Sequence, residues 1–292
     1  MSETNKRRIG LATCAALPGL DPDEQLVLEP LRGLGVEPVP AVWDDPAVDW
    51  AAFEFTVIRS TWDYTARLDE FLAWTRGVPR IFNPAEVIAW NTNKRYLADL
   101  AAAGLPVVPT EWIEPGGKVD LPADGAHVLK PAVGAGSVDA GRFDMRLAHE
   151  VDLARAHATR LLAAGHTVMV QPYLEQIDTA GEAGLIYLNG EFSHAVSKGA
   201  MLDSEKALVG GLFKEEKITP RTPSAAELDL AQQTLGAIPG GAERLLYARV
   251  DLVPDTNGEP LIIELELTEP SLFMGTVPGS AQRFARAIAA RM

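Results

Sequence analysis

Between Tyr247 and Leu267 the chain reads YARVDLVPDTNGEPLIIELEL, two alternating runs on either side of an Asn257-Gly258 pair. Alternation favours strands, and Asn-Gly is a strong signal for a two-residue hairpin turn. If that turn forms, Asp251 lies opposite Glu264 and Arg249 lies opposite Glu266. The sequence therefore predicts an antiparallel hairpin with three carboxylates and one guanidinium on a single face.

The other face of this hairpin is apolar, with Val250, Leu252, Ile263 and Leu265. Directly opposed carboxylates repel each other, and a bound divalent cation removes that repulsion. Magnesium prefers oxygen ligands and commonly completes its shell with water and substrate phosphate. We therefore predict a magnesium site at Asp251, Glu264 and Glu266. Two alternatives stay open: an amphipathic hairpin with its acidic face in water, and a bulge near the flanking prolines that shifts the register.

A magnesium site of this kind requires a bound phosphate group, so we expect a phosphate-binding loop elsewhere in the sequence. The stretch HVLKPAVGAGSVDAG, residues 127–141, places Lys130 at a strand end before a loop with glycines and Ser137. Backbone N–H groups of such a loop can close over phosphate oxygens. The loop is not of the Walker type, because the lysine precedes the glycines. By itself the loop is a weak signal, and an ordinary flexible turn is the more common explanation.

The first third of the chain alternates strand and helix, with strands at 8–14, 36–43 and 53–60 and a helix at 22–35. This pattern predicts a small parallel sheet. RSTWDY, Arg59 to Tyr64, follows its last strand, and ligands of open α/β sheets bind beyond the carboxyl ends of strands. The segment is therefore a candidate substrate site, although Trp62 and Tyr64 serve equally well as core residues.

The rest of the chain predicts mixed structure. We expect a helix that starts near Asn91 or Asn93 and ends just before Gly104, a second helix at 146–165, strands at 126–131 and 167–174, and a hairpin that turns at Asn189-Gly190. Ser224 and Glu227 form a capping box at the start of another helix. The stretch from Gly199 to Pro220 lacks periodicity and predicts a long functional loop.

Composition excludes several classes of function. The 292 residues carry a net charge of −14, which argues against binding of nucleic acid. No apolar run approaches the length of a membrane span, and the N-terminus lacks the apolar segment of a signal peptide, so we expect a cytoplasmic protein. The single cysteine and five histidines are not spaced as a zinc site.

Taken in order, the motifs resemble the ATP-grasp superfamily. They are Asn93-Lys94, VLKP at 128–131, VQPYL at 170–174, ARVDLV at 248–253 and IELEL at 263–267. The resemblance implies an α/β fold with α+β subdomains, in which a parallel-sheet domain precedes the ATP-grasp domains. The implied domains are a substrate-side domain at 1–86, a nucleotide-binding domain at 87–173 and a metal-binding catalytic domain at 174–292.

The resemblance also implies the site residues, ATP as cosubstrate and one or two magnesium ions. Lys94 and Lys130 would hold the nucleotide phosphates, with Arg249 on the transferred phosphoryl group. The remaining nucleotide contacts would be Ser137, Gln171, Tyr173, Leu174, Asp178 and Lys198. Glu266 stands where this superfamily usually has asparagine, which leaves the number of metal ions open. A homodimer is expected by analogy with this scaffold.

RSTWDY, NGEFSHAV, GGLFKEEKITPRTP and ELELTEPSLF look most like the branch that contains O-ureidoserine cyclo-ligase, which closes the cycloserine ring. The implied reaction activates a small amino-acid-like carboxylate as an acylphosphate, which a nitrogen of the same substrate then attacks. Arg59 would bind the substrate carboxylate, and the pocket would be formed by Ser60, Trp62, Asp63 and Tyr64. Two alternatives remain: a ligase that joins a carboxylate to a separate amine, and a regulatory nucleotide-binding protein without turnover.

Overall fold

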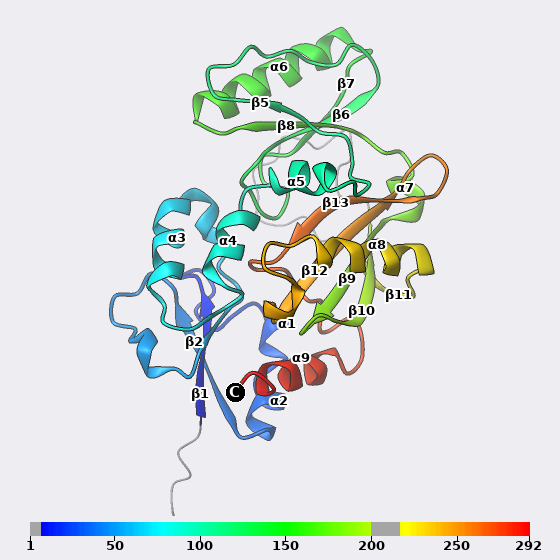
Figure 1. Ribbon diagram of the computed structural model, residues 1–292. Coiled ribbons are helices and arrows are strands. Elements are labelled where there is room, and N and C mark those ends of the chain that lie inside the picture. Colours follow the sequence, from blue (N-terminus) through cyan, green and yellow to red (C-terminus); the bar gives the residue numbers. More distant parts are fainter. Residues whose placement is uncertain (1–6, 200–216) are drawn as a thin grey trace, which may run out of the picture.

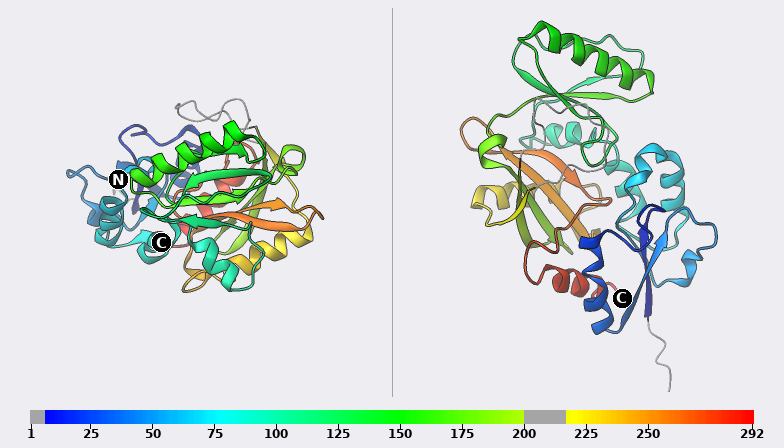
Figure 2. Two further views of the ribbon diagram at one scale, coloured as in Figure 1. Left: turned by 90° about the horizontal axis from the view of Figure 1, so that it is seen from above. Right: turned by 180° about the vertical axis from the view of Figure 1, so that it is seen from behind.

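The computed structural model describes residues 7–199 and 217–292, which form three sheets. Figure 1 shows them stacked, with the N-terminal sheet at the bottom, a five-stranded sheet in the middle and a four-stranded sheet on top. The view from behind in Figure 2 shows the same order. The predicted domain boundaries fall between sheets and stay predictions.

The N-terminal sheet is parallel, as predicted, with strand order β2-β1-β3-β4. Its strands are β1 (Arg7–Thr13), β2 (Val36–Val42), β3 (Thr56–Ile58) and β4 (Ile81–Phe82). The expected helix at 22–35 is two short helices, α1 (Pro22–Gln25) and α2 (Leu28–Gly33). Pro30 has no backbone N–H to donate. Because a new helix begins at Leu28, Pro30 lies in the first turn of α2, where the backbone N–H groups have no partner within the helix. The layer is completed by 3₁₀ turns at Trp50–Ala52 and Trp62–Ala66 and by α3 (Leu68–Gly77).

The upper sheet is antiparallel, in the order β5-β8-β6-β7. It contains β5 (Glu111–Ile113), β6 (Ala126–Pro131), β7 (Gly141–Asp144) and β8 (Val168–Pro172), with α6 (Ala148–Ala163) packed on it. The predicted strand at 126–131 and the helix within 146–165 are confirmed. The glycine loop connects β6 to β7, so it projects from the edge of this sheet over the central one.

The central sheet has the order β11-β10-β9-β12-β13. It contains β9 (Glu182–Leu188), β10 (Glu191–Lys198), β11 (Ile218–Arg221), β12 (Tyr247–Pro254) and β13 (Pro260–Glu266). Asn189 and Gly190 turn between β9 and β10 with positive φ at both residues, as a type I′ turn requires. Of the predicted 199–220 loop, residues 200–216 lie outside the described residues, and residues 218–220 belong to β11 instead.

Helices flank the central sheet. They are α7 (Ile177–Ala180), the 3₁₀ turn Ala242–Arg244 and α8 (Ala225–Gly236), which begins with the predicted capping box. The helix expected to start near Asn91 or Asn93 and to end before Gly104 is α5 (Tyr96–Ala102), which α4 (Ala85–Asn91) precedes after a break. At the end of α4, the Asn91 side chain donates to the Leu265 carbonyl and accepts the Leu267 N–H at the end of the acidic strand.

The predicted pairing of the decisive hairpin is confirmed, although its turn is not the predicted one. Asp251 lies opposite Glu264 and Arg249 opposite Glu266. Toward the turn, however, Pro254 pairs with Pro260, and the Asp255 carboxylate accepts the N–H groups of Asn257 and Glu259. The connection is therefore longer than two residues. A bulge at Ile263 compensates, and the bulge turns Ile263 toward a cavity rather than the predicted apolar face.

The last helix, α9 (Ser280–Ala289), returns to the N-terminal sheet. It lies beside α2 in Figures 1 and 2. Phe284 and Ile288 share a buried cluster with Ile9 and Leu11 of β1. The predicted first domain is thus completed by residues from the end of the predicted third domain.

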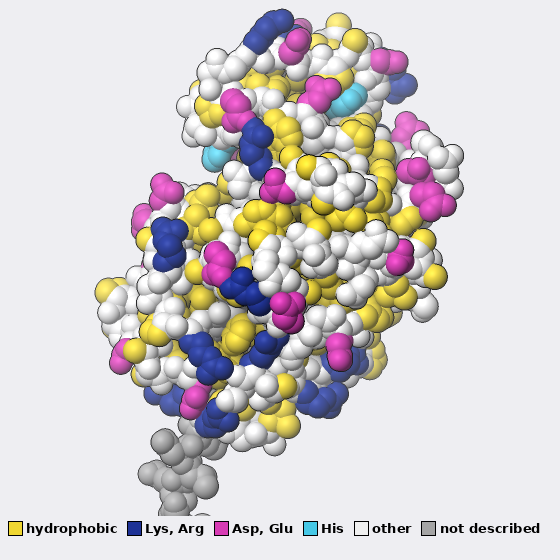
Figure 3. Space-filling view, in the orientation of Figure 1, with side chains coloured by type: hydrophobic (Ala, Val, Ile, Leu, Met, Phe, Trp, Pro, Cys, Tyr) yellow, Lys and Arg dark blue, Asp and Glu magenta, His cyan; other side chains and the backbone are white. Residues whose placement is uncertain are grey.

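The described surface carries both signs of charge. On the face shown in Figure 3, acidic side chains are spread from top to bottom, and basic ones are most numerous on the N-terminal layer. Among the described helices, none combines the length and apolarity that crossing a lipid bilayer requires.

Arg59 is part of the buried structure, and its predicted role as the substrate-binding arginine stays a prediction. Its side chain is 1% exposed and bonds the Glu24 carboxylate through Nε at 2.7 Å and Nη2 at 2.5 Å. Nη2 also donates to the Pro270 carbonyl at 2.5 Å. The guanidinium lies over the rings of Tyr247 and Phe284. Arg59 therefore joins β3 to α1, α9 and the segment after β13.

Replacing Glu24 with Ala should lower the free energy of unfolding by about 3–5 kcal/mol, because it leaves the buried guanidinium without its countercharge. Glu29→Ala, which removes an exposed partner of Arg32, should cost less than about 1 kcal/mol. Urea unfolding of both variants measures the difference. Equal losses of unfolding free energy in the two variants would show that the buried Arg59–Glu24 pair contributes no more to stability than the exposed pair.

Candidate active site

A cavity of about 1110 Å³ lies where the three sheets meet. The structure brings most of the predicted site residues to its wall. Those that line it are Trp62, Asp63, Tyr64, Lys94, Lys130, Ser137, Gln171, Tyr173, Leu174, Lys198, Arg249, Glu264 and Glu266. Arg59, Ser60, Asp178 and Asp251 are not part of the wall.

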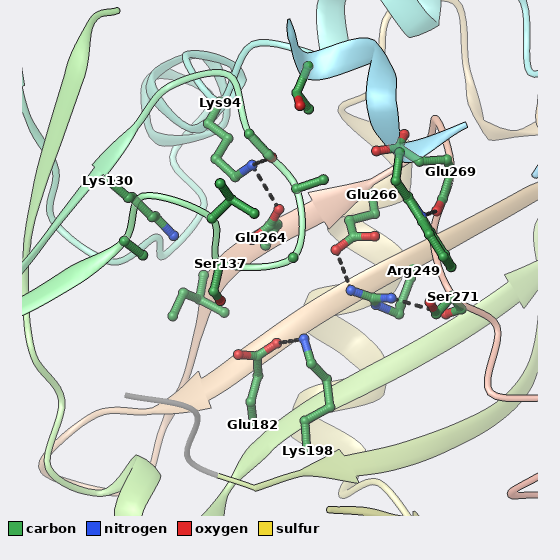
Figure 4. Close-up of a pocket in the computed structure, with 18 of the residues that line it drawn as sticks. Lys94, Lys130, Ser137, Glu182, Lys198, Arg249, Glu264, Glu266, Glu269 and Ser271 are labelled. Carbon is green, nitrogen blue, oxygen red and sulfur yellow. Dashed lines mark hydrogen bonds and ion pairs between the residues drawn. The ribbon is translucent and has the colours of Figure 1, made fainter. Parts of the chain in front are cut away.

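Arg249 organises the floor of the cavity (Figure 4). Its Nε and Nη2 each lie 2.8 Å from an oxygen of Asp251, and Nη2 also bonds Glu266 across the hairpin. Nη1 donates to the Ser271 carbonyl at 3.0 Å. Burial would lower the pKa of Arg249, but the two carboxylates raise it well above its ordinary value, so the guanidinium stays charged. Burial raises the pKa of Glu266 to about 7, against the pull of Arg249.

Lys198 neutralises the opposite side of the same face. Its Nζ bonds Glu182 at the start of β9 and lies 3.0 Å from Asp251 Oδ2. Burial raises the pKa of Glu182 to about 7, whereas Arg249 and Lys198 overcome burial at Asp251 and lower its pKa. Repulsion between the opposed carboxylates is thus relieved in this structure by interleaved cations.

Two lysines lie below the glycine loop and differ in their partners. Lys94 Nζ is 3.1 Å from Glu264 and donates to the Gly134 carbonyl of the loop at 2.7 Å. Burial would lower the pKa of Lys94, but Glu264 and other carboxylates raise it. The Lys130 side chain has no hydrogen bond or ion pair with another described residue, and burial lowers its pKa. Among the described lysines and arginine of the cavity wall, Lys130 is therefore the one without a carboxylate in ion-pair contact.

The predicted metal ligands stay a prediction, and two of the three face the cavity. Glu264 and Glu266 present hard oxygen donors to the cavity, which fits magnesium. Asp251 is fully buried behind Arg249 and does not face the cavity, so its predicted place as a direct ligand is not seen here. Among the described residues, no group of three or more His, Cys, Asp or Glu side chains is arranged to hold a metal ion together.

The predicted nucleotide-base contacts lie at the upper end of the cavity. Gln171 donates from Nε2 to Thr110 Oγ1 at 2.9 Å, and the Tyr173 N–H donates to the Ala126 carbonyl. The Tyr173 hydroxyl bonds Asp178, which is exposed beside the cavity rather than in its wall. The base contacts of Gln171, Tyr173 and Leu174 and the ribose contact of Asp178 stay predictions.

The N-terminal layer closes the other end. Trp62 lines the cavity and donates to the Glu269 carbonyl, and Asp63 accepts from the Trp43 indole at 2.9 Å. Tyr64 lines the cavity and stacks on Phe71, so it is both a wall residue and a core residue. Ser60 is fully buried, where its hydroxyl accepts the Asp21 N–H, and its predicted place in the substrate pocket stays a prediction.

Sequence reasoning missed three acidic residues of the wall, Asp21, Glu182 and Glu269. Glu269 belongs to the quoted motif ELELTEPSLF, but it lies beyond the strand whose alternation carried the prediction. Glu182 opens a strand, EAGLIYL, whose apolar run gives no sign of which strand end meets the cavity. The pairing of β9 with β10 places Glu182 opposite Lys198, and the neighbouring β12 brings Asp251 to the same lysine.

Comparisons with known proteins point to one family. A family model described as the N-terminal domain of D-cycloserine synthetase DcsG matches residues 9–83. The cycloserine biosynthesis protein DcsG of Streptomyces lavendulae is 35% identical over 97% of this chain and 98% of its own. A crystal structure of D-cycloserine synthetase DcsG superposes with a TM-score of 0.86 at 36% identity, covering 97% of this chain and 99% of the other.

A more distant structure shares the fold alone. The ATP-grasp ligase PsnB, complexed with a minimal precursor, Mg and ADP, has a TM-score of 0.62 at 18% identity. It covers 100% of this chain and 99% of its own. The predicted ATP-grasp fold, with its N-terminal parallel sheet, is therefore confirmed.

Lys130→Met should leave the free energy of unfolding unchanged or slightly higher, because burying an uncompensated ammonium group opposes folding. Lys94→Met should lower the free energy of unfolding by about 2 kcal/mol or more, since it leaves Glu264 buried without its cation. Denaturant unfolding of the ligand-free protein checks both. A larger loss for Lys130→Met would contradict the assignment of partners.

Proposed function

Because the chain belongs to the DcsG family of ATP-grasp ligases, we propose that it uses ATP to activate the carboxylate of O-ureidoserine and closes it into the cycloserine ring. The observation that carries the proposal is the order of groups along one cavity. Lys130 and the glycine loop lie at one end, Arg249 with Glu264 and Glu266 lies in the middle, and an aromatic pocket lies at the other end.

Lys130 and Lys94 suit the phosphates of ATP. Lys130 has no competing partner among the described residues, and Lys94 reaches both the acidic strand and the glycine loop. Backbone N–H groups of that loop complete an anion-binding surface. PsnB has been solved with Mg and ADP on the same fold, which supports the nucleotide as cosubstrate. Ser137 belongs to this loop and would contact the phosphates.

Glu264 and Glu266 would hold magnesium, which when bound neutralises phosphate oxygens. One or two ions would fit the proposal. Asp251 keeps Arg249 charged and oriented from behind. Arg249 would then stabilise the charge on the transferred phosphoryl group as the substrate carboxylate attacks it. Such transfer depends on position and charge rather than on a nucleophilic side chain of the protein.

The activated carboxylate must meet a nitrogen nucleophile. In O-ureidoserine the nitrogen bonded to oxygen belongs to the same molecule, so one bound substrate supplies both reacting groups. Its attack on the acylphosphate would expel phosphate, and hydrolysis of the carbamoyl group from the same nitrogen would then leave the cycloserine ring. The close relation to DcsG favours this intramolecular course over joining to a separate amine. We propose that the reaction takes place in the cytoplasm, where ATP is available. We also propose a homodimer by analogy with the scaffold, and light scattering would check it.

ADP release should occur with ATP, magnesium and O-ureidoserine without an added amine, with the D and L forms assayed separately. Glu264→Gln should lower turnover on the order of 10²- to 10³-fold, because it removes a charge from the phosphoryl-transfer site. The exposed Glu29→Gln variant is the matched control. An absolute requirement for a second amine would contradict ring closure, and nucleotide binding without any turnover would contradict the ligase proposal.

A further inference from the structure

Glu269 is a buried carboxylate at the end of the cavity away from Lys130. It lies in the segment that follows β13, and its side chain lines the cavity beside Glu266 and Ser271 (Figure 4). The residue is 9% exposed. The proposed phosphate and metal contacts leave it without an assigned role.

Charge pairing sets Glu269 apart from the other carboxylates of the cavity wall that are comparably enclosed. Glu264 pairs with Lys94, Glu266 with Arg249, and Glu182 with Lys198. Among the described residues, Glu269 has no cationic partner, and its side chain interacts with the Tyr64 hydroxyl. Burial and the neighbouring Glu266 raise its pKa to about 8. A buried carboxylate without a countercharge is costly, and a cationic ligand group relieves that cost.

The backbone that carries Glu269 is also held in place. Trp62 Nε1 donates to the Glu269 carbonyl at 3.3 Å, and Arg59 Nη2 donates to the carbonyl of the next residue, Pro270, at 2.5 Å. The Tyr64 hydroxyl fixes the side chain from the N-terminal layer. A fixed acceptor loses little conformational freedom when it binds a ligand, so it discriminates more sharply than a mobile one.

We propose that Glu269, positioned by Tyr64, binds the α-ammonium group of the amino-acid substrate. This rests on the proposed function and names the group that selects its substrate class. Ammonium and carboxylate of an α-amino acid share one carbon atom. Fixing the ammonium at Glu269 therefore confines the substrate carboxylate to the region beside Glu266 and Arg249, where activation is proposed to occur. Carboxylates that lack an α-amino group would leave Glu269 uncompensated and would be rejected.

The test compares O-ureidoserine with 3-(ureidooxy)propanoate, which lacks only the amino group. The wild-type kcat/KM should be about 10- to 100-fold higher for O-ureidoserine than for 3-(ureidooxy)propanoate, which is the effect of one charge-assisted hydrogen bond. Glu269→Gln keeps the shape and removes the charge, so it should raise KM for O-ureidoserine and abolish most of that preference. KM for ATP should stay within about 2-fold. Glu191→Gln, an exposed position on β10, is the control.

An undiminished preference for the amine in Glu269→Gln would overturn the inference while leaving ring closure intact. If Glu269→Gln does not melt cooperatively, Glu269→Asp replaces it. The shortened carboxylate should raise KM for O-ureidoserine and keep a preference for the amine, and an unchanged KM would overturn the inference.

Absence of wild-type turnover with O-ureidoserine would instead contradict the proposed function. The inference is then decided by calorimetry of the Mg-ADP complex with D-serine and with 3-hydroxypropanoate. Binding of D-serine alone, lost in Glu269→Gln, would support it. Equal binding of the two, or binding of neither, would overturn it.

Discussion

The active site depends on the neutralisation of buried carboxylates by interleaved cations. Arg249 bridges Asp251 on its own strand and Glu266 on the next, while Lys198 and Lys94 neutralise the flanking acids. In a low-dielectric cavity, each of these acids would be unstable without its partner. This balance lets the protein keep a dense array of acceptors in its interior, where phosphates and their counterions must be handled away from bulk water.

The strand that carries these acids is held by side chains from elsewhere in the chain. Asn91 bonds the backbone of Leu265 and Leu267, and the Tyr96 hydroxyl accepts the Leu265 N–H. Asn83 bonds Leu246 and Leu267 from the end of the parallel sheet. These contacts fix the acidic strand against both neighbouring layers. The cavity is therefore a property of the junction between the layers and not of any one sheet.

The sequence was most informative where local periodicity decided the structure. Alternation placed Arg249, Asp251, Glu264 and Glu266 on one face, but two errors cancelled, because the longer turn and the bulge at Ile263 together restore the predicted pairing. Arg59 shows the opposite case. Its position after a strand suggested a ligand, yet its partner Glu24 is remote in sequence, and no local pattern predicts that pairing. Glu182 and Glu269 were missed because only the tertiary structure brings them to the cavity wall.

The return of α9 to the first strand bears on how the protein is made. Arg7 bonds the carbonyl of Met292, 285 residues away, and β1 is buried in part by Phe284 and Ile288. Contacts between such distant segments slow folding, because a long loop must close before they form. During synthesis one apolar face of the parallel sheet stays uncovered until α9 has left the ribosome. Until α9 is made, the apolar face that it covers is exposed to aggregation and open to chaperones.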